Sequence, residues 1–537
     1  MTFAHFFHLR PNKLLLLLGS GCAVLASIIL QNKGVLPLDT VTFIFFSFVL
    51  FLFALYRPAW AFLLFVALLP LETVDLGSSV FSGITLRPYQ WLMVLLFLAL
   101  IVRFILKKLP FQLFRPKIFD LLPVLFALSA FFGALGGGDA SRALKQAVIV
   151  SSFVALYFLG RIFFRTPFDV AQALPFFLLS SAIVLGYALF QNIQFLLGKE
   201  SFQVMIGRPN ATFPEADWLG MFVLICIGVL VGLLSFVIHR FEQKTQSTAR
   251  LFVLIPLLAL SFVVLVLTVA RSAWLGVAFM LFVFSLGFFF SYSRQNILHA
   301  AKKTFFLDGI LFGTFVVACG LVAFFHLSPF QFFNRIQSTG TGLQKITISC
   351  DTEKSLPDKI GSTEELTGFD CRHIALEEID KERSEGRFVT EIYRNDPNIS
   401  IRKETYKTVW EVLKNHPVLG IGWGNIAASL GTDEHGSSLN SSNMFLEIWL
   451  GSGLIGLVSF TIFWFVLLGA SFVQYWKDDD RGDRLFALSI GSILIGTTIF
   501  NLFNAGLLLG FFFLMLSIAT RSLETVQKER FLGKDLV

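Results

Sequence analysis

The sequence predicts an all-α membrane protein. We expect a polytopic transmembrane helical bundle of about 12–14 spans with a large extracytoplasmic loop that carries an amphipathic surface helix. The first supporting observation is composition, since 55% of the 537 residues are hydrophobic, 15% are charged and 65 are Phe. Soluble folds of this length are far less apolar. The second is a series of long apolar runs, and the third is that Lys and Arg gather in alternate segments between them.

Each long apolar run is a candidate span, because about 20 apolar residues cross the hydrocarbon core of a bilayer. The run at 59–70 is short and could form half of a bent hairpin with its neighbour. The run at 444–474 is long and could be kinked or begin outside the membrane. The first run is expected to be retained, because no clean cleavage site follows it. In order, the candidate spans are about 13–30, 38–56, 59–70, 86–106, 119–135, 144–160, 172–197, 218–238, 251–270, 272–292, 304–326, 444–474, 485–501 and 503–520.

The distribution of basic residues predicts the topology. Cytoplasmic loops of membrane proteins carry an excess of Lys and Arg, and most basic residues fall on one side when the N-terminus is placed inside. Both termini are then cytoplasmic. Residues 327–443 lie outside, between N-terminal transmembrane helices at 1–326 and C-terminal transmembrane helices with a cytoplasmic tail at 444–537. The net charge of +7 reflects this bias, so nucleic acid is not an expected partner. The basic residues on the outer side are Lys33, Arg87, Arg142, Lys145, Lys199, Arg208 and Arg271.

The outer segment is polar, and its first two-thirds, about 336–398, show weak periodicity and many turn residues. This pattern predicts an irregular insertion. Cys350 and Cys371 lie within it and could form a disulfide if the segment is extracytoplasmic, or stay free thiols. The chain contains no C-x-x-C or H-E-x-x-H metal motif.

The last third of the segment predicts an amphipathic helix at about 400–415. Its apolar residues recur at helical spacing, with charged residues on the other faces. His416-Pro417 ends this helix, because the residue before proline avoids the α region. Glycines at 420, 422 and 424 then allow tight turns, and Asn443 can cap the next helix. The apolar residues are Ile401, Tyr406, Val409, Trp410 and Leu413.

This stretch resembles the signature of the O-antigen ligase and polymerase superfamily, membrane glycosyltransferases that use polyprenyl-pyrophosphate-linked glycans. The family pattern is an arginine-led amphipathic helix, a P-L-L-G-x-G-x-G turn and H-N-x-x-L-x-x-x-x-E-x-G-x-x-G. Ser442 stands where the family usually has histidine, and Gly451 stands where it usually has glutamate. The residues in register are Arg402, the Pro417 to Gly424 turn, Asn443, Leu446, Gly453 and Gly456.

Two further segments resemble the same family. Arg271 lies in L-T-V-A-R-S-A-W, between two spans with almost no loop, and resembles a turn in which the family arginine faces the donor pyrophosphate. Arg208 lies in G-R-P-N-A-T-F-P-E-A-D, which is similar to the family's R-x-x-G-T-F-x-x-P-N loop, with Ala211 in place of the glycine. Arg87 and Arg142 are further outer cations near span ends that could contact substrate.

The resemblance implies transfer of a glycan from a polyprenyl diphosphate to an acceptor hydroxyl. Negative charge grows on the diphosphate as it leaves, and guanidinium groups bind phosphate oxygens bidentately. Diphosphate is a good leaving group, so neither a metal nor another cofactor is required. A base must take the acceptor proton. Because Ser442 replaces the usual histidine, the candidates are His435, Glu215 and Asp217, with Asp433 and Glu434 as further carboxylate alternatives. The expected substrate-binding residues are Arg208, Arg271, Arg402, Arg142, Asn443 and Ser442, with the first three meeting in one cavity.

The predicted function is therefore that of a metal-independent membrane glycosyltransferase in the assembly of cell-surface polysaccharide or lipopolysaccharide. The implied partners are an undecaprenyl or other polyprenyl-pyrophosphate-linked glycan donor, a glycan or lipid acceptor and the lipid bilayer. The implied location is the bacterial inner (plasma) membrane. Ligase, polymerase and protein oligosaccharyltransferase activities remain open, as do the sugar and the oligomeric state. A transporter or flippase of lipid-linked glycans, and a catalytically degenerate family member, are the alternatives.

Overall fold

The structure is a computed structural model that describes residues 11–77, 85–109, 116–204, 207–242, 251–293, 296–328, 343–352, 357–361, 363–374, 379–395, 397–432 and 439–532. The chain divides into two compact units. A helical unit comprises Met1–Phe324 and Asn415–Val537, and a smaller unit comprises Phe325–Lys414. The chain therefore leaves the helical unit once and returns to it.

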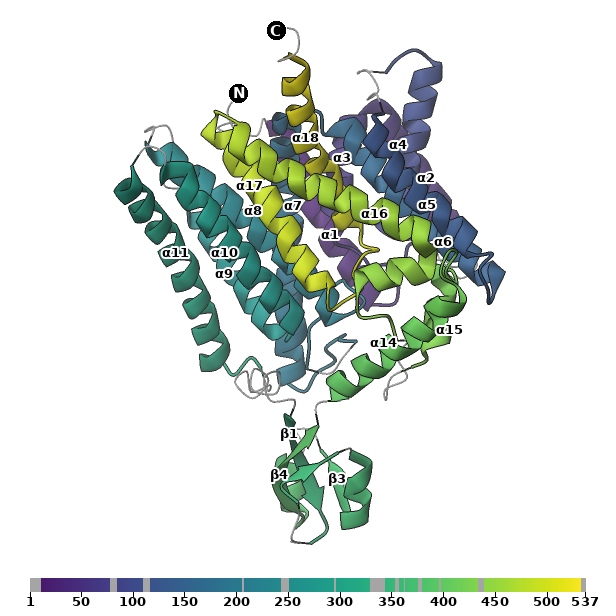
Figure 1. Ribbon diagram of the computed structural model, residues 1–537, viewed down its shortest axis with the longest axis vertical. Coiled ribbons are helices and arrows are strands. Elements are labelled where there is room, and N and C mark those ends of the chain that lie inside the picture. Colours follow the sequence, from purple (N-terminus) through teal and green to yellow (C-terminus); the bar gives the residue numbers. More distant parts are fainter. Residues whose placement is uncertain are drawn as a thin grey trace. The chain divides into compact units, whose positions relative to one another are not determined.

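The helical unit is built mainly from long apolar helices, with a few short helices between them (Figure 1). Those of its first part are α1 (Pro11–Asn32), α2 (Thr40–Tyr56), α3 (Pro58–Leu68), α4 (Pro88–Ile105), η2 (Ile118–Asp120), α5 (Leu121–Gly133), α6 (Ala140–Phe163), α7 (Pro167–Leu196), α8 (Ala216–Glu242), α9 (Leu251–Leu267), α10 (Arg271–Ser293) and α11 (Ile297–Phe324). Those of its second part are η6 (Trp423–Asn425), α15 (Ile426–Leu430), α16 (Met444–Lys477), α17 (Arg481–Asn501) and α18 (Gly510–Leu532).

These helices confirm the prediction of an all-α polytopic bundle. Among the described residues, nine helices are long and apolar enough to cross a membrane, by length and composition. Shorter apolar helices account for the remaining predicted spans, including α2, α3 and α9. Arg57 alone separates α2 from α3, so the short run at 59–70 does pair with its neighbour around a sharp bend.

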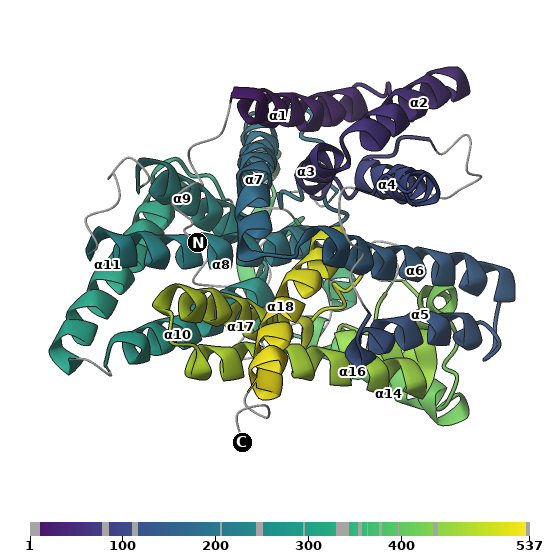
Figure 2. The ribbon, with the colours of Figure 1, turned by 90° about the horizontal axis from the view of Figure 1, so that it is seen from above.

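The centre of the helical unit is formed by helices far apart in sequence. α17 packs between α10 and α16, and α8 packs against α9, α10 and α17 (Figure 2). α16 also packs against α5 and α18, and α18 packs against α6. Among the nine candidate spans, α8 is the most enclosed. The N-terminal helices α1 to α4 contact one another and α7 instead.

α16 is kinked at Gly453, as its length suggested. Gly453 has φ 65° and ψ −170°, a conformation that is essentially restricted to glycine. In a continuous helix, Leu454 N–H would donate to Leu450 O. Here Leu454 N–H donates to Val418 O at 2.9 Å, and Leu450 O accepts from Ile421 N–H at 2.7 Å. The broken helical bond is thus replaced by two bonds to the segment that precedes α16.

We call that segment, residues 417–425, the glycine turn. Its backbone passes so close to its neighbours that side chains do not fit. A Cβ on Gly420 would lie 2.3 Å from Leu450 O, and one on Gly424 would lie 2.5 Å from Arg142 O. A Cβ on Gly451 would lie 2.5 Å from the Trp423 ring. A family-type glutamate at position 451 would therefore collide with Trp423.

Substituting Gly453→Ala is expected to destabilise the protein by about 3 kcal/mol, because the new Cβ would be 2.1 Å from Val418 O in a conformation that alanine avoids. Thermal unfolding of the detergent-purified protein measures this loss. Gly469→Ala in the same helix is the matched control, since nothing lies within 4 Å of its Cβ position. Equal unfolding temperatures for the two variants would contradict the kink.

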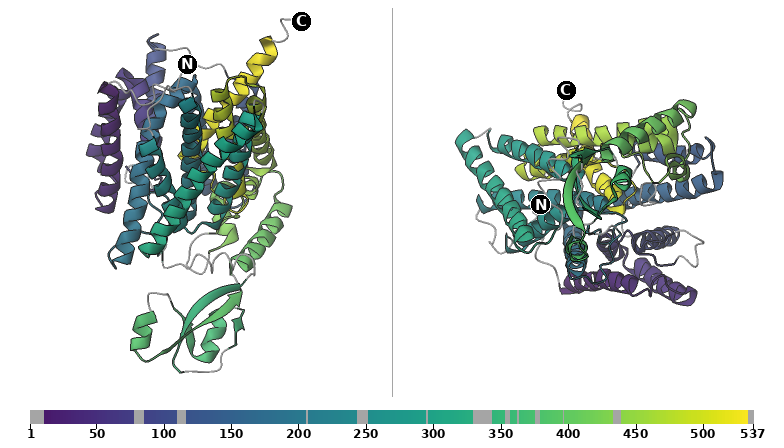
Figure 3. Two further views of the ribbon diagram at one scale, coloured as in Figure 1. Left: turned by 90° about the vertical axis from the view of Figure 1, so that its left-hand side faces the viewer. Right: turned by 90° about the horizontal axis from the view of Figure 1, so that it is seen from below.

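The smaller unit contains a β-sheet, so the prediction of an irregular insertion at about 336–398 was wrong. The strands have the order β2-β4-β1-β3. Figure 3 shows this sheet from two further directions. β1 pairs antiparallel with β4 from Leu343 opposite Asn395 to Cys350 opposite Phe388. The elements are β1 (Leu343–Cys350), β2 (Lys359–Ile360), η4 (Thr363–Phe369), β3 (Cys371–His373), α13 (Ile379–Ser384), β4 (Phe388–Asn395) and α14 (Pro397–Asn415).

Alternate residues of β1 build the core of this sheet. Ile346, Ile348 and Cys350 are buried on one face, together with Leu366 of η4 and Ile392 of β4. Cys350 and Cys371 form a disulfide, which resolves the choice that the sequence left open. A core this small gains stability from such a cross-link.

α14 confirms the predicted amphipathic helix and extends it by three residues at its N-terminal end. It ends at Asn415, directly before His416-Pro417. Val409 and Leu413 are buried, whereas Tyr406 and Trp410 are exposed. The apolar stripe is therefore narrower than the sequence pattern suggested, and the two aromatic residues lie outside it.

Glu382 of α13 has a buried carboxylate, which connects α13 to the sheet. It accepts a hydrogen bond from Ser349 Oγ at 2.6 Å and pairs with Arg372 and Arg387. The Ser349 hydrogen bond, assisted by Arg372 and Arg387, holds the pKa of Glu382 below its ordinary value.

This depressed pKa makes the smaller unit less stable in acid. The stabilisation is complete above the ordinary glutamate pKa of about 4.3 and is lost as the pH falls through the lower folded-state value. We expect hydrogen exchange at residues 343–395 of the full-length protein to accelerate between pH 5 and pH 3, and Glu382→Gln to remove this step. A step of the same size in the variant would assign it to another group.

Candidate functional site

Arg208 lies in the loop that precedes α8. Its side chain connects the start of α8 with the segment that precedes α10. Its Nε donates to Thr268 O at 2.9 Å, and its Nη2 donates to Asp217 Oδ1 at 3.1 Å. The side chain of Arg208 is 13% exposed and that of Asp217 is 28% exposed. Two of the predicted site residues are therefore in direct contact. Asp217 lies in the first turn of α8, where its negative charge suits the helix dipole.

The carbonyl that Arg208 binds belongs to the turn between α9 and α10, which ends at Arg271. This turn is only three residues long, as predicted. It lies directly on α8, because a Cβ on Gly220 would be 3.0 Å from Ala270 Cβ. Arg271, which is partly exposed, is thus placed beside the Arg208 loop by the fold.

The connection between α17 and α18 adds residues that the sequence analysis missed. Asn504 Nδ2 donates to Ser272 Oγ at 2.5 Å, next to Arg271. Asn443 Nδ2 donates to Leu502 O at 3.2 Å. The same connection therefore touches the start of α10 and the start of α16. The sequence feature that could have identified Asn504 was the N-L-F-N pattern between two apolar runs, since polar residues beside spans are often functional.

Asn443 caps α16, as the sequence predicted. Its Oδ1 accepts from Phe445 N–H at 2.9 Å and from Leu446 N–H at 3.2 Å. Ser442 precedes it with φ 51° and donates its N–H to Asn440 Oδ1 at 2.9 Å. Both side chains are partly exposed at this end of the helix.

Glu447 is a second residue that the sequence analysis missed. It lies one turn after Asn443, and its Oε2 accepts from Ser441 N–H at 2.8 Å. A carboxylate near the end of an apolar span was the signal that could have found it.

Arg142 lies beside the glycine turn rather than beside Arg208. It follows Asp139, the N-cap of α6, and its side chain is 57% exposed. Asn425 of the turn donates to Gly137 O at 3.0 Å and accepts from Asp139 N–H at 3.2 Å. Arg142 therefore presents its charge at the edge of a rigid junction between α6 and the glycine turn.

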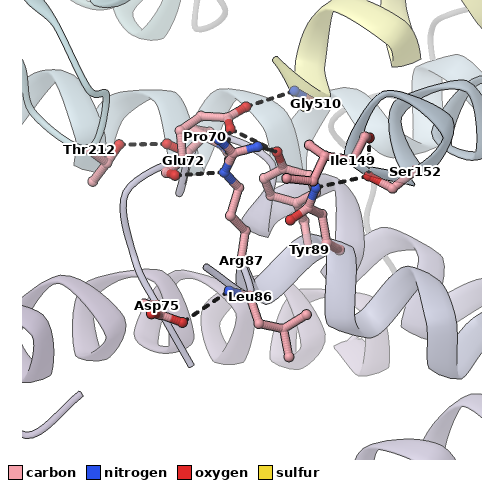
Figure 4. A network of polar contacts seen from close by, with 11 residues as sticks. Pro70, Glu72, Asp75, Leu86, Arg87, Tyr89, Ile149, Ser152, Thr212 and Gly510 are labelled. Atoms are coloured by element: carbon pink, nitrogen blue, oxygen red, sulfur yellow. Dashed lines mark hydrogen bonds and ion pairs between the residues drawn. The ribbon is translucent and has the colours of Figure 1, made fainter. Parts of the chain in front are cut away.

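Arg87 is held in a buried network (Figure 4). Its Nε lies 3.2 Å from Glu72 Oε2, which also accepts from Tyr89 at 2.7 Å. Glu72 Oε1 accepts from Gly510 N–H at 2.7 Å, at the start of α18. The N–H groups of Glu72 and Thr73 both donate to Thr212 O. Arg87 thus supports the Arg208 loop indirectly, through the backbone of Glu72.

For three further predicted residues, membership of this group stays a prediction. His435 lies outside the described residues, together with Asp433 and Glu434. Glu215 directly precedes α8, is partly buried and accepts Leu219 N–H at its carbonyl. Arg402 belongs to α14 of the smaller unit, so its convergence with Arg208 and Arg271 stays a prediction. Across the described ranges, no three His, Cys, Asp or Glu side chains lie close enough to hold a metal ion.

The Arg208–Asp217 contact should carry a measurable coupling energy. A double-mutant cycle with Arg208→Ala and Asp217→Ala is expected to give about 1 kcal/mol, since both side chains are largely shielded from water. Thermal unfolding of the four proteins measures it. The exposed Arg142–Asp139 pair, 3.9 Å apart, is the control and should couple by close to zero. Coupling of equal size in both pairs would contradict the special position of Arg208.

A comparison with protein-family models matches residues 256–461 to the family described as O-antigen ligase. The match runs from α9 into α16 and includes Arg271, the smaller unit, the glycine turn, Asn443 and the kink at Gly453. Arg208 and Asp217 lie outside the matched range and reach it only through the fold. Comparisons with curated proteins and with solved structures give no match.

Proposed function

We propose that this chain, whose residues 256–461 match the O-antigen ligase family, transfers a glycan from a polyprenyl diphosphate to an acceptor hydroxyl. This proposal rests on the hydrogen bond from Arg208 Nε to Thr268 O, which lies in the turn that leads into Arg271. Arg271 resembles the family arginine that faces the donor pyrophosphate, and Arg208 lies in a loop that is similar to a second family motif. One of them lies in the family match and the other lies outside it.

The chemistry of the leaving group supports this assignment. As the bond from the anomeric carbon to the diphosphate breaks, negative charge grows on the phosphate oxygens. Arg208 is fixed through Thr268 O and Asp217, so part of its guanidinium is already oriented before a ligand arrives. Preorganised donors of this kind stabilise developing charge without having to reorganise. Arg271, Asn443 and Ser442 are proposed to bind the rest of the donor and acceptor, with Arg402 and Arg142 contributing from α14 and α6.

The proposed topology places residues 327–443 outside a bacterial plasma membrane, between the transmembrane segments 1–326 and 444–537. The Cys350–Cys371 disulfide supports this side, because disulfides form in oxidising compartments. The acceptor would then be met at the outer face of the membrane. His435, Glu215 and Asp217 are the candidates for the base that takes the acceptor proton.

Replacing Arg208 or Arg271 by Ala is expected to lower transfer by about 100-fold or more, because each variant loses a preorganised positive charge. The assay uses purified protein with a polyprenyl-diphosphate-linked glycan extracted from membranes of the source cells, and it measures release of polyprenyl diphosphate. Lys199→Ala is the control, since Lys199 is an exposed cation on the same predicted side.

The same assay distinguishes the rival functions. Wild-type protein that moves the lipid-linked glycan across vesicles without releasing polyprenyl diphosphate would indicate a flippase. Binding without either reaction would indicate a degenerate family member. Unchanged transfer by both arginine variants would remove the observation on which the proposal depends.

A further inference from the structure

The first turn of α16 holds a carboxylate whose position suits proton transfer. Glu447 follows Asn443 by one turn, and its own N–H donates to Asn443 O at 2.9 Å. Oε2 is fixed by Ser441 N–H at 2.8 Å. Among the described residues, the Ser441 side chain also contacts this carboxylate, and the Glu447 side chain is partly exposed. The carboxylate is thus held by Ser441 and can still receive a proton.

Glu447 belongs to the same end of the bundle as the two arginines. Asn443, its neighbour one turn back, donates to Leu502 O, and two residues later Asn504 donates to Ser272 beside Arg271. Arg208 binds Thr268 O on the other side of Arg271. These contacts connect the start of α16 to the arginine pair through one short connection, residues 502–504.

The other groups at this end are less suited to the task. Asp217 Oδ1 already accepts a hydrogen bond from Arg208 Nη2 at 3.1 Å. Ser442, at the usual histidine position, is a hydroxyl that cannot accept a proton near neutral pH. Glu447 lies five residues after Ser442, on the helix that Asn443 caps.

We propose that Glu447 is the general base of the transfer reaction, an inference that rests on the proposed function. The acceptor hydroxyl gives its proton to the Glu447 carboxylate as its oxygen bonds to the anomeric carbon. The bond from that carbon to the diphosphate breaks, and the electron pair leaves with the diphosphate beside the arginines. Glu447 then releases the proton to water, so no co-reactant is needed.

A purely structural role for Glu447 predicts a different outcome for one substitution. In Glu447→Gln the amide oxygen can still accept from Ser441 N–H, so the local turn survives, but the side chain can no longer take a proton. We therefore expect kcat to fall by about 100-fold or more, with binding of the polyprenyl-diphosphate-linked glycan and the unfolding temperature unchanged. Glu447→Asp should keep part of the activity, and Glu200→Gln, an exposed control, should keep all of it.

The outcomes separate this inference from the proposed function. If Glu447→Gln transfers glycan at the wild-type rate, or if it loses donor binding to the same extent as transfer, Glu447 is not the base. Either result leaves the proposed glycosyltransferase function in place. Wild-type protein that releases no polyprenyl diphosphate overturns both. If Glu447→Gln does not fold, Glu447→Ala with added formate provides the second measurement. Transfer restored by formate supports a missing base, and full transfer without formate contradicts it.

Discussion

The structure depends on one exchange of hydrogen bonds at the kink of α16. Leu450 and Leu454 give up the bond that they would share in a continuous helix and take partners in the glycine turn instead. Unpaired backbone groups are unfavourable when they are buried away from water, so the kink and the turn require each other. Ile421 and Val418 supply the missing donor and acceptor, and glycines at the crossing leave room for the backbones. The hydrogen bonds to the glycine turn therefore fix the direction of the first part of α16, which differs from that of the rest of the helix.

A second set of bonds ties the loops at the ends of the helices together. Glu72, neutralised by Arg87, holds the start of α18 and, through its backbone, the Arg208 loop. Arg208 binds the turn before α10, and the connection before α18 binds α10 and α16. Groups that bind a leaving diphosphate work best when their supports are fixed before the substrate arrives. In the proposed reaction, the polar residues near the helix ends would provide such supports.

The sequence predicted local features well and misjudged one non-local feature. The helix end at Asn415, the tight glycine turn and the cap at Asn443 each depend on a few adjacent residues. The sheet of the smaller unit was missed, although Ile346, Ile348 and Cys350 alternate in β1. β1 is stabilised by β4, about forty residues later, and by a disulfide. The β4 partner cannot be recognised from the β1 segment itself, and the sequence left the Cys350–Cys371 pairing open.

The sequence by itself determined which segments are apolar helices and which arginines stand between them, because span length, helical period and capping are short-range properties. Only the tertiary structure decided what those arginines touch. Arg87 resembles Arg208 in sequence position near a span end, yet one supports a loop through Glu72 and the other bridges Asp217 and Thr268. Asn504 likewise contacts Ser272 only because the fold brings them together. Hydrogen bonds and ion pairs act over about 3 Å, and only folding brings residues hundreds of positions apart within that distance.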